Sequence, residues 1–340
     1  MRALRLLGDK HLDVYEVPDP EPGPADVVVR LTRAAVCGTD IHLYRAPADI
    51  VPPVVPGHEP VGVVEHAGDA APVALLGTRV LVAGVVGCGG CAMCRSGVNN
   101  ACAQAVAMGL SRDGADATHV VVPWTNVVAL PDELSCDAAA VLTCAGGTAY
   151  TVMRECGVTG EDQVAVLGLG PVGLSLVILA TSMGATVVGS DPVAARRRQA
   201  LDLGAAAVVD PSTGDAAELL QAATSGRGYD VVAECVGRAE TQKLALAVVA
   251  MRGRVAMAGL GDEPVTVNWM RDVLARHARV VGISATPIAY FPALVERAAR
   301  LRLPFERLVT HRFPLEQAVE AFAVMESGDC GKVVFDFACS

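Results

Sequence analysis

The chain has 340 residues, a formal net charge of −10, 52% hydrophobic residues and only 4% aromatic ones. The length predicts two domains, and the composition suits a core of Val, Ala and Leu, as in parallel strands covered by helices. The densest basic run is Arg196–Arg198, so neither nucleic acid nor a membrane is an expected partner. The first residues lack the apolar stretch of a signal peptide, and no apolar run reaches the roughly 18–20 residues that span a bilayer, so a cytoplasmic protein is expected.

The first third of the chain is rich in Gly and Pro. Short apolar runs at 26–31 and 62–65 are separated by turn signals such as the proline-rich stretch 18–24. This pattern predicts a compact antiparallel β domain.

Within that domain, Cys37 lies in the stretch Cys-Gly-Thr-Asp and His58 in Gly-His-Glu, while Cys144 follows much later. Two thiolates and one imidazole from separate segments would leave the fourth position of a tetrahedral zinc ion open, as catalysis requires. Each residue also has an ordinary structural explanation, because single buried cysteines act as small hydrophobes. Spacing alone therefore leaves both possibilities open.

Four more cysteines crowd into 15 residues. Cys88, Cys91, Cys94 and Cys102 form the pattern C-x2-C-x2-C-x7-C. Such spacing presents four thiolates to one metal ion and closes its coordination shell, which predicts a structural zinc site. An iron–sulfur cluster is the rival interpretation, but the long last gap and the lack of a second cluster motif favour zinc.

From about residue 163 the pattern changes to apolar strands that alternate with helices. Helices are predicted from about 171 to 183 and from 193 to 203. Strands are predicted at 164–167, 186–189, 207–209, 231–233, 255–257 and 280–282. This alternation is typical of a doubly wound parallel sheet.

The turn after the first of these strands carries a dinucleotide-binding motif. Gly168, Gly170 and Gly173 form G-x-G-x-x-G between a predicted strand and a predicted helix, whose N-terminus can bind a pyrophosphate. Asp191 ends the next strand, where a carboxylate can accept hydrogen bonds from the adenosine ribose and repel a 2′-phosphate. NAD is therefore expected rather than NADP, although Arg196 and Arg197 weaken that preference.

The tail after residue 284 is predicted to contain helices near 288–302 and 315–327 and a strand at 332–335. It adds no seventh strand–helix unit, so it is expected to rejoin the first domain. The expected domains are thus 1–146 with 284–340, and 147–283.

In combination, these motifs resemble the zinc-containing medium-chain alcohol dehydrogenase family, in the right order and over essentially the whole chain. The resemblance implies an α/β fold, with a GroES-like, β-rich catalytic domain and a doubly wound Rossmann domain around an active-site cleft. It also implies a homodimer or homotetramer, two zinc ions per chain, NAD, and a small alcohol or carbonyl substrate.

The resemblance further implies the roles of single residues. Cys37, His58 and Cys144 would bind the catalytic zinc. Asp40 would orient His58, and Glu59 would lie beside the metal and coordinate it transiently.

Other residues would serve the proton and the cofactor. Thr39 would accept the hydroxyl proton of the substrate and begin a relay through the cofactor ribose to His42. Thr148 and Val172 would abut the nicotinamide end of NAD.

Two parts of the sequence resemble enzymes that act on different substrates. Cys37–His42, followed by Tyr44, resembles polyol and threonine dehydrogenases, whereas Cys144 at the third metal position resembles simple alcohol dehydrogenases. A secondary alcohol, polyol or cyclitol is expected. The alternatives are a zinc-independent quinone or enoyl reductase of the same fold, and a non-catalytic NAD-sensing zinc protein.

Overall fold

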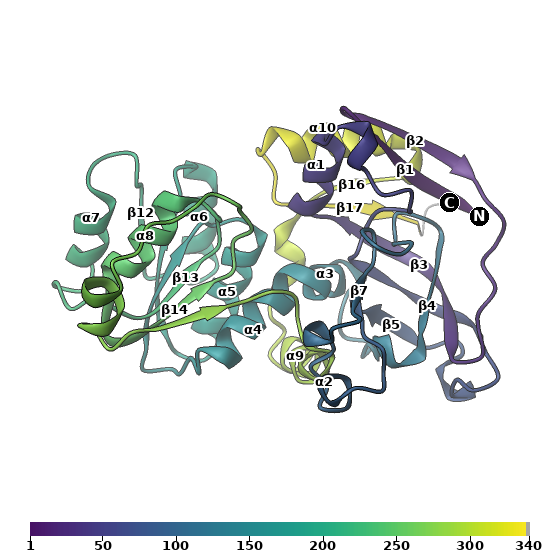
Figure 1. Cartoon of the computed structure of the whole chain (residues 1–340), viewed down its shortest axis with the longest axis horizontal. Coiled ribbons are helices and arrows are strands. Elements are labelled where there is room, and N and C mark those ends of the chain that lie inside the picture. Colours follow the sequence, from purple (N-terminus) through teal and green to yellow (C-terminus); the bar gives the residue numbers. More distant parts are fainter. Residues whose placement is uncertain (338–340) are drawn as a thin grey trace. The chain divides into compact units, whose positions relative to one another are not determined.

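The computed structural model describes residues 1–337. The chain forms two compact units, one made of Met1–Gly147 with the segment from Ala285 onward, and the other of Thr148–Ser284. Figure 1 shows their helices and strands. Among the described residues, no helix has both the length and the apolar character needed to cross a membrane.

The first unit is built on a seven-stranded sheet. Its strands follow the order β16-β17-β3-β4-β5-β9, and β8 also pairs with β3. The strands are β3 (Asp26–Val36), β4 (Pro60–Ala67), β5 (Arg79–Val82), β8 (His119–Pro123), β9 (Val127–Ala129), β16 (Val309–Phe313) and β17 (Lys332–Asp336). β3 is long and mostly buried because seven of its eleven residues are Val, Leu or Ala (DVVVRLTRAAV), so it forms the centre of the core.

Shorter elements complete this unit. Two small antiparallel sheets pair β1 (Arg2–Gly8) with β2 (His11–Glu16), and β6 (Val85–Val86) with β7 (Val106–Ala107). The α-helices are α1 (Gly38–Arg45), α2 (Ala92–Arg95), α3 (Cys136–Val141), α9 (Phe291–Arg300) and α10 (Ala318–Ser327).

The C-terminal segment adds two strands to this sheet. β17 runs antiparallel to β3, with Val333 opposite Val36. β16, which the sequence pattern does not predict, pairs in parallel with β17. Its five residues, Val-Thr-His-Arg-Phe, alternate in burial for too short a stretch to stand out.

An ion-pair network ties α3 to this sheet. Asp137 accepts hydrogen bonds from Arg33 Nε at 2.8 Å and from Arg312, and Arg33 also binds Asp336. The side chains of Arg33, Asp137 and Asp336 are 13–17% exposed. Burial acts to raise the pKa of Asp137, but the two guanidinium groups outweigh it and lower that pKa.

We expect Asp137→Asn to lower the free energy of unfolding by about 2 kcal/mol at pH 7, because two guanidinium groups lose their anion. Since the folded-state pKa is lowered, this stabilisation is present above the ordinary carboxyl pKa and disappears as the pH falls through the folded value. Urea unfolding at pH 7 and at pH 3 should therefore show a difference from wild type that shrinks in acid. Asp132→Asn, at a fully exposed carboxylate, is the matched control. An equal loss of unfolding free energy in Asp132→Asn would contradict a specific stabilising role of Asp137.

The second unit is a six-stranded parallel sheet of order β12-β11-β10-β13-β14-β15. Its strands are β10 (Gln163–Leu167), β11 (Thr186–Ser190), β12 (Ala207–Val209), β13 (Tyr229–Glu234), β14 (Val249–Met257) and β15 (Arg279–Gly282). Each of the six contains a predicted strand and most extend beyond it, β14 by six residues at its start. The strand order confirms the Rossmann-like fold.

Helices pack on this sheet and complete its core. They are α4 (Gly147–Glu155), α5 (Pro171–Thr181), α6 (Ala194–Asp202), α7 (Ala216–Ala222) and α8 (Ala239–Val248). α5 is almost wholly buried because it is apolar all round (PVGLSLVILAT). Tyr229 is the largest buried side chain, and its hydroxyl donates to the carbonyl of Leu220 at 2.8 Å.

Candidate functional site

Three distant segments of the first unit bring metal-binding side chains together. The ligand atoms of Cys37, His58, Glu59 and Cys144 all lie within 4.8 Å of one another. Cys37 is the residue before α1, at the end of β3, and His58 with Glu59 immediately precedes β4. Cys144 lies on a π-helical turn, Leu142–Gly146, between α3 and α4. Such turns displace one residue from the regular helix and often occur at functional sites.

Asp40 links two of these side chains. Its Oδ2 accepts a hydrogen bond of 2.7 Å from the backbone N–H of Cys37. Its Oδ1 lies 3.5 Å from Nδ1 of His58, while Nε2 of His58 faces Glu59 at 3.9 Å. A carboxylate on one ring nitrogen leaves the other nitrogen to bind a metal, which is the usual arrangement of a histidine ligand.

The metal-binding side chains shift one another's pKa values. The hydrogen bond from Cys144 lowers the pKa of the Cys37 thiol well below its usual value, against the opposing effect of burial. The same hydrogen bond, together with burial, raises the pKa of Cys144. Burial acts to lower the pKa of His58, but Asp40 and Cys37 outweigh it and raise that pKa. Thiols and an imidazole that shift one another's pKa values in this way are typical of functional sites.

Glu59 has a partner that the sequence analysis missed. Its Oε1 accepts a hydrogen bond from Nζ of Lys332, and both side chains are at most 2% exposed. Burial raises the pKa of Glu59 to about 7, although Lys332 acts against it. Lys332 begins a predicted strand, where a lysine is usually solvated, and no spacing pattern connects it to a residue 273 positions earlier.

Asp116 is a second residue that the sequence did not single out. It is fully buried behind Gly57, and neither carboxylate oxygen has a hydrogen-bond partner among the described residues. Burial and the charge of Asp40 raise its pKa well above the usual value. We assign it no role in the reaction.

This donor set fits a zinc ion. Two thiolates and one imidazole suit zinc, and a tetrahedral ion would keep a fourth position for water, substrate or a carboxylate. Oε2 of Glu59 is buried without a hydrogen-bond partner among the described residues. Orphaned polar atoms of this kind are costly unless a ligand or ion accounts for them.

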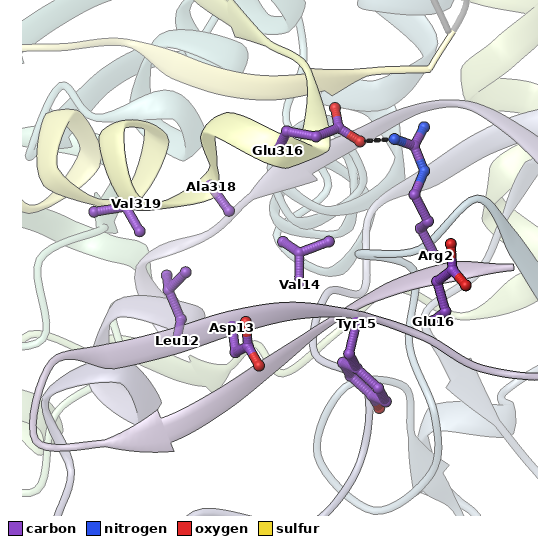
Figure 2. Close-up of a pocket in the computed structure, with 9 residues that line it drawn as sticks. All are labelled: Arg2, Leu12, Asp13, Val14, Tyr15, Glu16, Glu316, Ala318 and Val319. Carbon is purple, nitrogen blue, oxygen red and sulfur yellow. Dashed lines mark hydrogen bonds and ion pairs between the residues drawn. The ribbon is translucent and has the colours of Figure 1, made fainter.

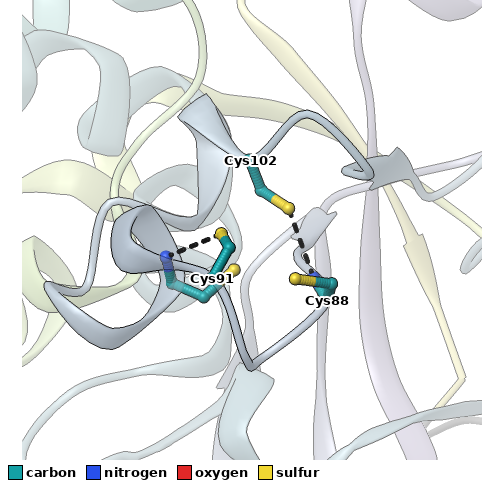
Figure 3. Close-up of side chains that lie close together, drawn as sticks. Cys88, Cys91 and Cys102 are labelled. Carbon is teal, nitrogen blue, oxygen red and sulfur yellow. Dashed lines mark hydrogen bonds between the residues drawn. The ribbon is translucent and has the colours of Figure 1, made fainter.

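The four-cysteine segment also gathers its side chains. The sulfur atoms of Cys88, Cys91, Cys94 and Cys102 lie within 4.8 Å of one another. Cys91 accepts a hydrogen bond from the N–H of Cys94 at 3.4 Å, and Cys102 accepts one from Cys88 N–H at 3.5 Å (Figure 3). Amide hydrogen bonds to sulfur favour the thiolate form that a metal requires.

The four thiols differ in acidity. Hydrogen bonds from the amides of Gly90 and Cys91 lower the pKa of Cys88 to about 6, whereas burial raises that of Cys94 to about 12. Asn99 anchors the segment, because Nδ2 donates to Val85 O at 2.6 Å and Oδ1 accepts from Ile288 N–H at 2.8 Å. The four-sulfur group therefore fits a closed metal site that holds a loop in place.

The dinucleotide motif of the second unit has the expected local structure. Gly168 follows β10 with φ of 91°, which favours glycine, and α5 begins at Pro171. A Cβ on Gly173 would lie 1.9 Å from the carbonyl oxygen of Gly168, so only glycine allows this close approach. Gly170 has open space at the same position, as a turn that approaches a phosphate needs.

Asp191 lies beside this motif. It is 3% exposed, and its two oxygens accept backbone hydrogen bonds of 2.8 Å from Leu169 and Val193. Arg196 lies 3.7 Å from the same carboxylate. The structure thus brings Asp191 to the Gly168 turn.

The remaining predicted residues occupy the starts of three helices. Thr39 lies on α1, with its hydroxyl 3.8 Å from the sulfur of Cys37. His42 is exposed on the same helix, three residues later. Thr148 and Val172 lie in the first turns of α4 and α5, and both are partly exposed.

A groove of about 470 Å³ lies elsewhere in the first unit, between β2 and the start of α10 (Figure 2). Arg2 pairs with Glu316 at its rim, and Val14 and Val319 contribute apolar surface. None of the predicted site residues lines this groove, so it does not contribute to the candidate site.

Two family models match the chain. A zinc-binding dehydrogenase model covers residues 171–300, and an alcohol dehydrogenase GroES-like domain model covers residues 23–132. Among curated proteins, the uncharacterized zinc-type alcohol dehydrogenase-like protein YphC of Escherichia coli K12 is 34% identical, over 99% of both chains. An L-threonine 3-dehydrogenase of Coxiella burnetii is 32% identical, over 95% of both chains.

Solved structures agree with this result. The alcohol dehydrogenase TADH from Thermus sp. ATN1 is 30% identical, with a TM-score of 0.93 over 99% of both chains. A zinc-binding dehydrogenase from Sinorhizobium meliloti 1021 bound to NADP is 32% identical, with a TM-score of 0.90 over 98% of both. An alcohol dehydrogenase (rspB) from E. coli CFT073 with NADH is 26% identical, with a TM-score of 0.92 over 99% of both.

Proposed function

Because the chain belongs to the zinc-containing medium-chain alcohol dehydrogenase family, we propose that it oxidises a secondary alcohol with neighbouring polar groups, using NAD. The general reaction follows from the family: the chain is a zinc-dependent oxidoreductase that acts on CH–OH groups with a nicotinamide cofactor. The observation that carries the proposal is the close grouping of the side chains of Cys37, His58, Glu59 and Cys144.

In this proposal Cys37, His58 and Cys144 hold the catalytic zinc, and Asp40 fixes the orientation of the imidazole. When bound, zinc supplies a Lewis-acid centre for the alcohol oxygen, and NAD supplies the hydride acceptor. Thr39, beside Cys37, accepts the hydroxyl proton in a hydrogen bond. His42, exposed on the same helix, releases that proton to solvent.

We also propose that Cys88, Cys91, Cys94 and Cys102 hold a second, structural zinc. Four sulfur ligands leave no position for a substrate. The site therefore stabilises the loop between β6 and β7 and takes no part in the reaction.

Gly168, Gly170 and Gly173 would bind the pyrophosphate of the cofactor, and Asp191 the adenosine ribose, while Thr148 and Val172 would contact the nicotinamide. NAD is favoured over NADP because the backbone hydrogen bonds hold the Asp191 carboxylate in place, where it would repel a 2′-phosphate. The homologues were solved with NADP and with NADH, so a direct comparison of the two cofactors is needed.

We expect Asp191→Ser to reduce the preference for NAD over NADP, as the ratio of kcat/KM values, by about tenfold, which corresponds to ~1.4 kcal/mol. Removal of the carboxylate eliminates the repulsion and leaves Arg196 to attract the phosphate. Steady-state kinetics with both cofactors would measure the ratio. Asp202→Ser, on the exposed side of α6, is the control, and an unchanged ratio in Asp191→Ser would contradict the assignment.

The substrate class rests on the sequence around Cys37 and on the curated relatives, several of which are L-threonine 3-dehydrogenases. A panel of simple alcohols, polyols, cyclitols and amino alcohols, each tested with NAD and NADP, would be followed by NADH absorbance. We expect the highest kcat/KM with secondary alcohols that carry an adjacent hydroxyl or amino group. A clear preference for simple primary alcohols would contradict this substrate class.

We propose that the chain is a homodimer or homotetramer and that β15 contributes to the contact. β15 is an edge strand, and Val280 on it is 41% exposed. Trp269, Met270 and Leu274, on the preceding turn, are each more than 60% exposed. An open strand edge beside exposed large apolar side chains is typical of a protein interface.

We expect the double substitution Val280→Lys with Trp269→Arg to reduce the mass in solution from a multiple of 35.0 kDa toward that of one chain. Light scattering after size exclusion would measure it. The control Val319→Lys introduces a charge at another exposed valine. A double variant with the wild-type mass would exclude this edge as the interface.

A further inference from the structure

We propose that Lys332 is a positioning residue that holds the carboxylate of Glu59 away from the open coordination position of the catalytic zinc. This inference rests on the proposed zinc ligands Cys37, His58 and Cys144. Lys332 belongs to none of the sequence motifs, and its place in the structure is what identifies it.

The sheet explains how a lysine reaches the metal group. Lys332 is the first residue of β17, and the register pairs Val333 with Val36. The next residue after Val36 is Cys37, so the start of β17 lies beside the first metal ligand. Lys332 is 2% exposed. Burial acts to lower its pKa, but Glu59, followed by the thiols of Cys37 and Cys144, outweighs burial and raises that pKa.

The two oxygens of Glu59 have different surroundings. Oε1 accepts the hydrogen bond from the Lys332 ammonium, whereas Oε2 is buried and has no hydrogen-bond partner among the described residues. At the same time, Glu59 offers an oxygen within 4.8 Å of the Cys37, His58 and Cys144 ligand atoms. Oε1 also lies 3.9 Å from Nε2 of His58, so the oxygen that binds the ammonium is within reach of the metal position as well.

Charge balance shows why the ammonium matters. With zinc bound, two thiolates and one carboxylate carry three negative charges, and the divalent ion and the ammonium carry three positive ones. Without Lys332, the Glu59 carboxylate would be a buried negative charge without its ammonium partner. Because an unpaired buried charge is costly, binding of the carboxylate to the metal ion would become more favourable. The carboxylate would then coordinate zinc and close the position that the alcohol oxygen needs.

The test uses the enzyme with cobalt(II) in place of the catalytic zinc, with imidazole as an external ligand followed by visible absorption. The variants are Lys332→Met, Lys332→Arg, and the double variant Lys332→Met/Glu59→Gln. Changes next to metal ligands typically alter affinity 10- to 100-fold. We expect imidazole to bind at least tenfold more weakly to Lys332→Met, with a cobalt spectrum that changes little on its addition. In the double variant, imidazole binding should return to within about threefold of the wild type.

Lys332→Arg keeps a cation beside Glu59 and should recover most of the imidazole affinity. The double variant contains no unpaired buried charge, so it remains informative if Lys332→Met does not fold. Wild-type imidazole affinity in folded Lys332→Met, or equal weakening in the single and double variants, would overturn the proposal. A failure of the zinc assignment is distinguishable, because the wild-type protein itself would then bind no cobalt at this position.

Discussion

Replacing Cys37 with Ser should reduce turnover on the order of 10³-fold or more and lower the zinc content from two ions per chain to one. A tenfold rate loss corresponds to about 1.4 kcal/mol, and a metal ion contributes several kcal/mol of charge stabilisation in the transition state. The hydroxyl of Ser is a poor zinc ligand at neutral pH, since it is not ionised as the thiol of Cys37 is. The four-sulfur site is formed by separate residues, so its zinc should remain.

Elemental analysis and NADH absorbance would measure both effects on the same preparation. Cys330→Ser is the matched control, because Cys330 belongs to neither metal group and donates to the carbonyl of Val324. Full activity in Cys37→Ser would support a zinc-independent reductase of the same fold. Tight NADH binding by the wild type, without turnover of any alcohol or carbonyl, would support an NAD-sensing protein.

The second large effect concerns stability. We expect Cys102→Ser to release the structural zinc and to lower the apparent Tm on the order of 10 °C. Loss of a structural metal site costs several kcal/mol, and each 1 kcal/mol shifts the Tm by about 2–4 °C in domains of this size. Cys102 is buried, and its sulfur accepts hydrogen bonds from the amides of Cys88 and Gln104, so no solvent ligand can easily replace it.

Differential scanning calorimetry together with zinc analysis would test this expectation. Ser96→Ala, at an exposed residue of the same loop whose hydroxyl bonds only to the carbonyl of Met93 among the described residues, is the control. A Cys102→Ser protein that keeps two zinc ions per chain, or one with an unchanged Tm, would contradict the structural assignment.

Local patterns predicted much of this molecule. The six parallel strands follow from apolar runs between helices, and the four-cysteine site follows from spacings of 3, 3 and 8 positions within one loop. The Gly168 turn and Asp191 lie one strand and one helix apart, so their proximity follows from the regular geometry of parallel sheets.

Long-range contacts could not be predicted in this way. Cys37, His58 and Cys144 were connected by family resemblance, because their spacing alone has an equally good structural explanation. The contact between Glu59 and Lys332 spans 273 positions and depends on how β17 pairs with β3. β16 could not be predicted for a related reason. Whether a five-residue segment forms a strand depends more on the strand it pairs with, here β17, than on its own sequence.

The most direct test of hydride transfer is an isotope measurement. The best substrate of the alcohol panel would be prepared with deuterium at the carbinol carbon and incubated with the enzyme and NAD. Mass spectrometry would then give the deuterium content of the NADH that forms. Direct hydride transfer at this zinc site predicts one deuterium per NADH, and no NADH after removal of the zinc held by Cys37, His58 and Cys144. NADH without deuterium, or unchanged turnover after loss of that zinc, would contradict it.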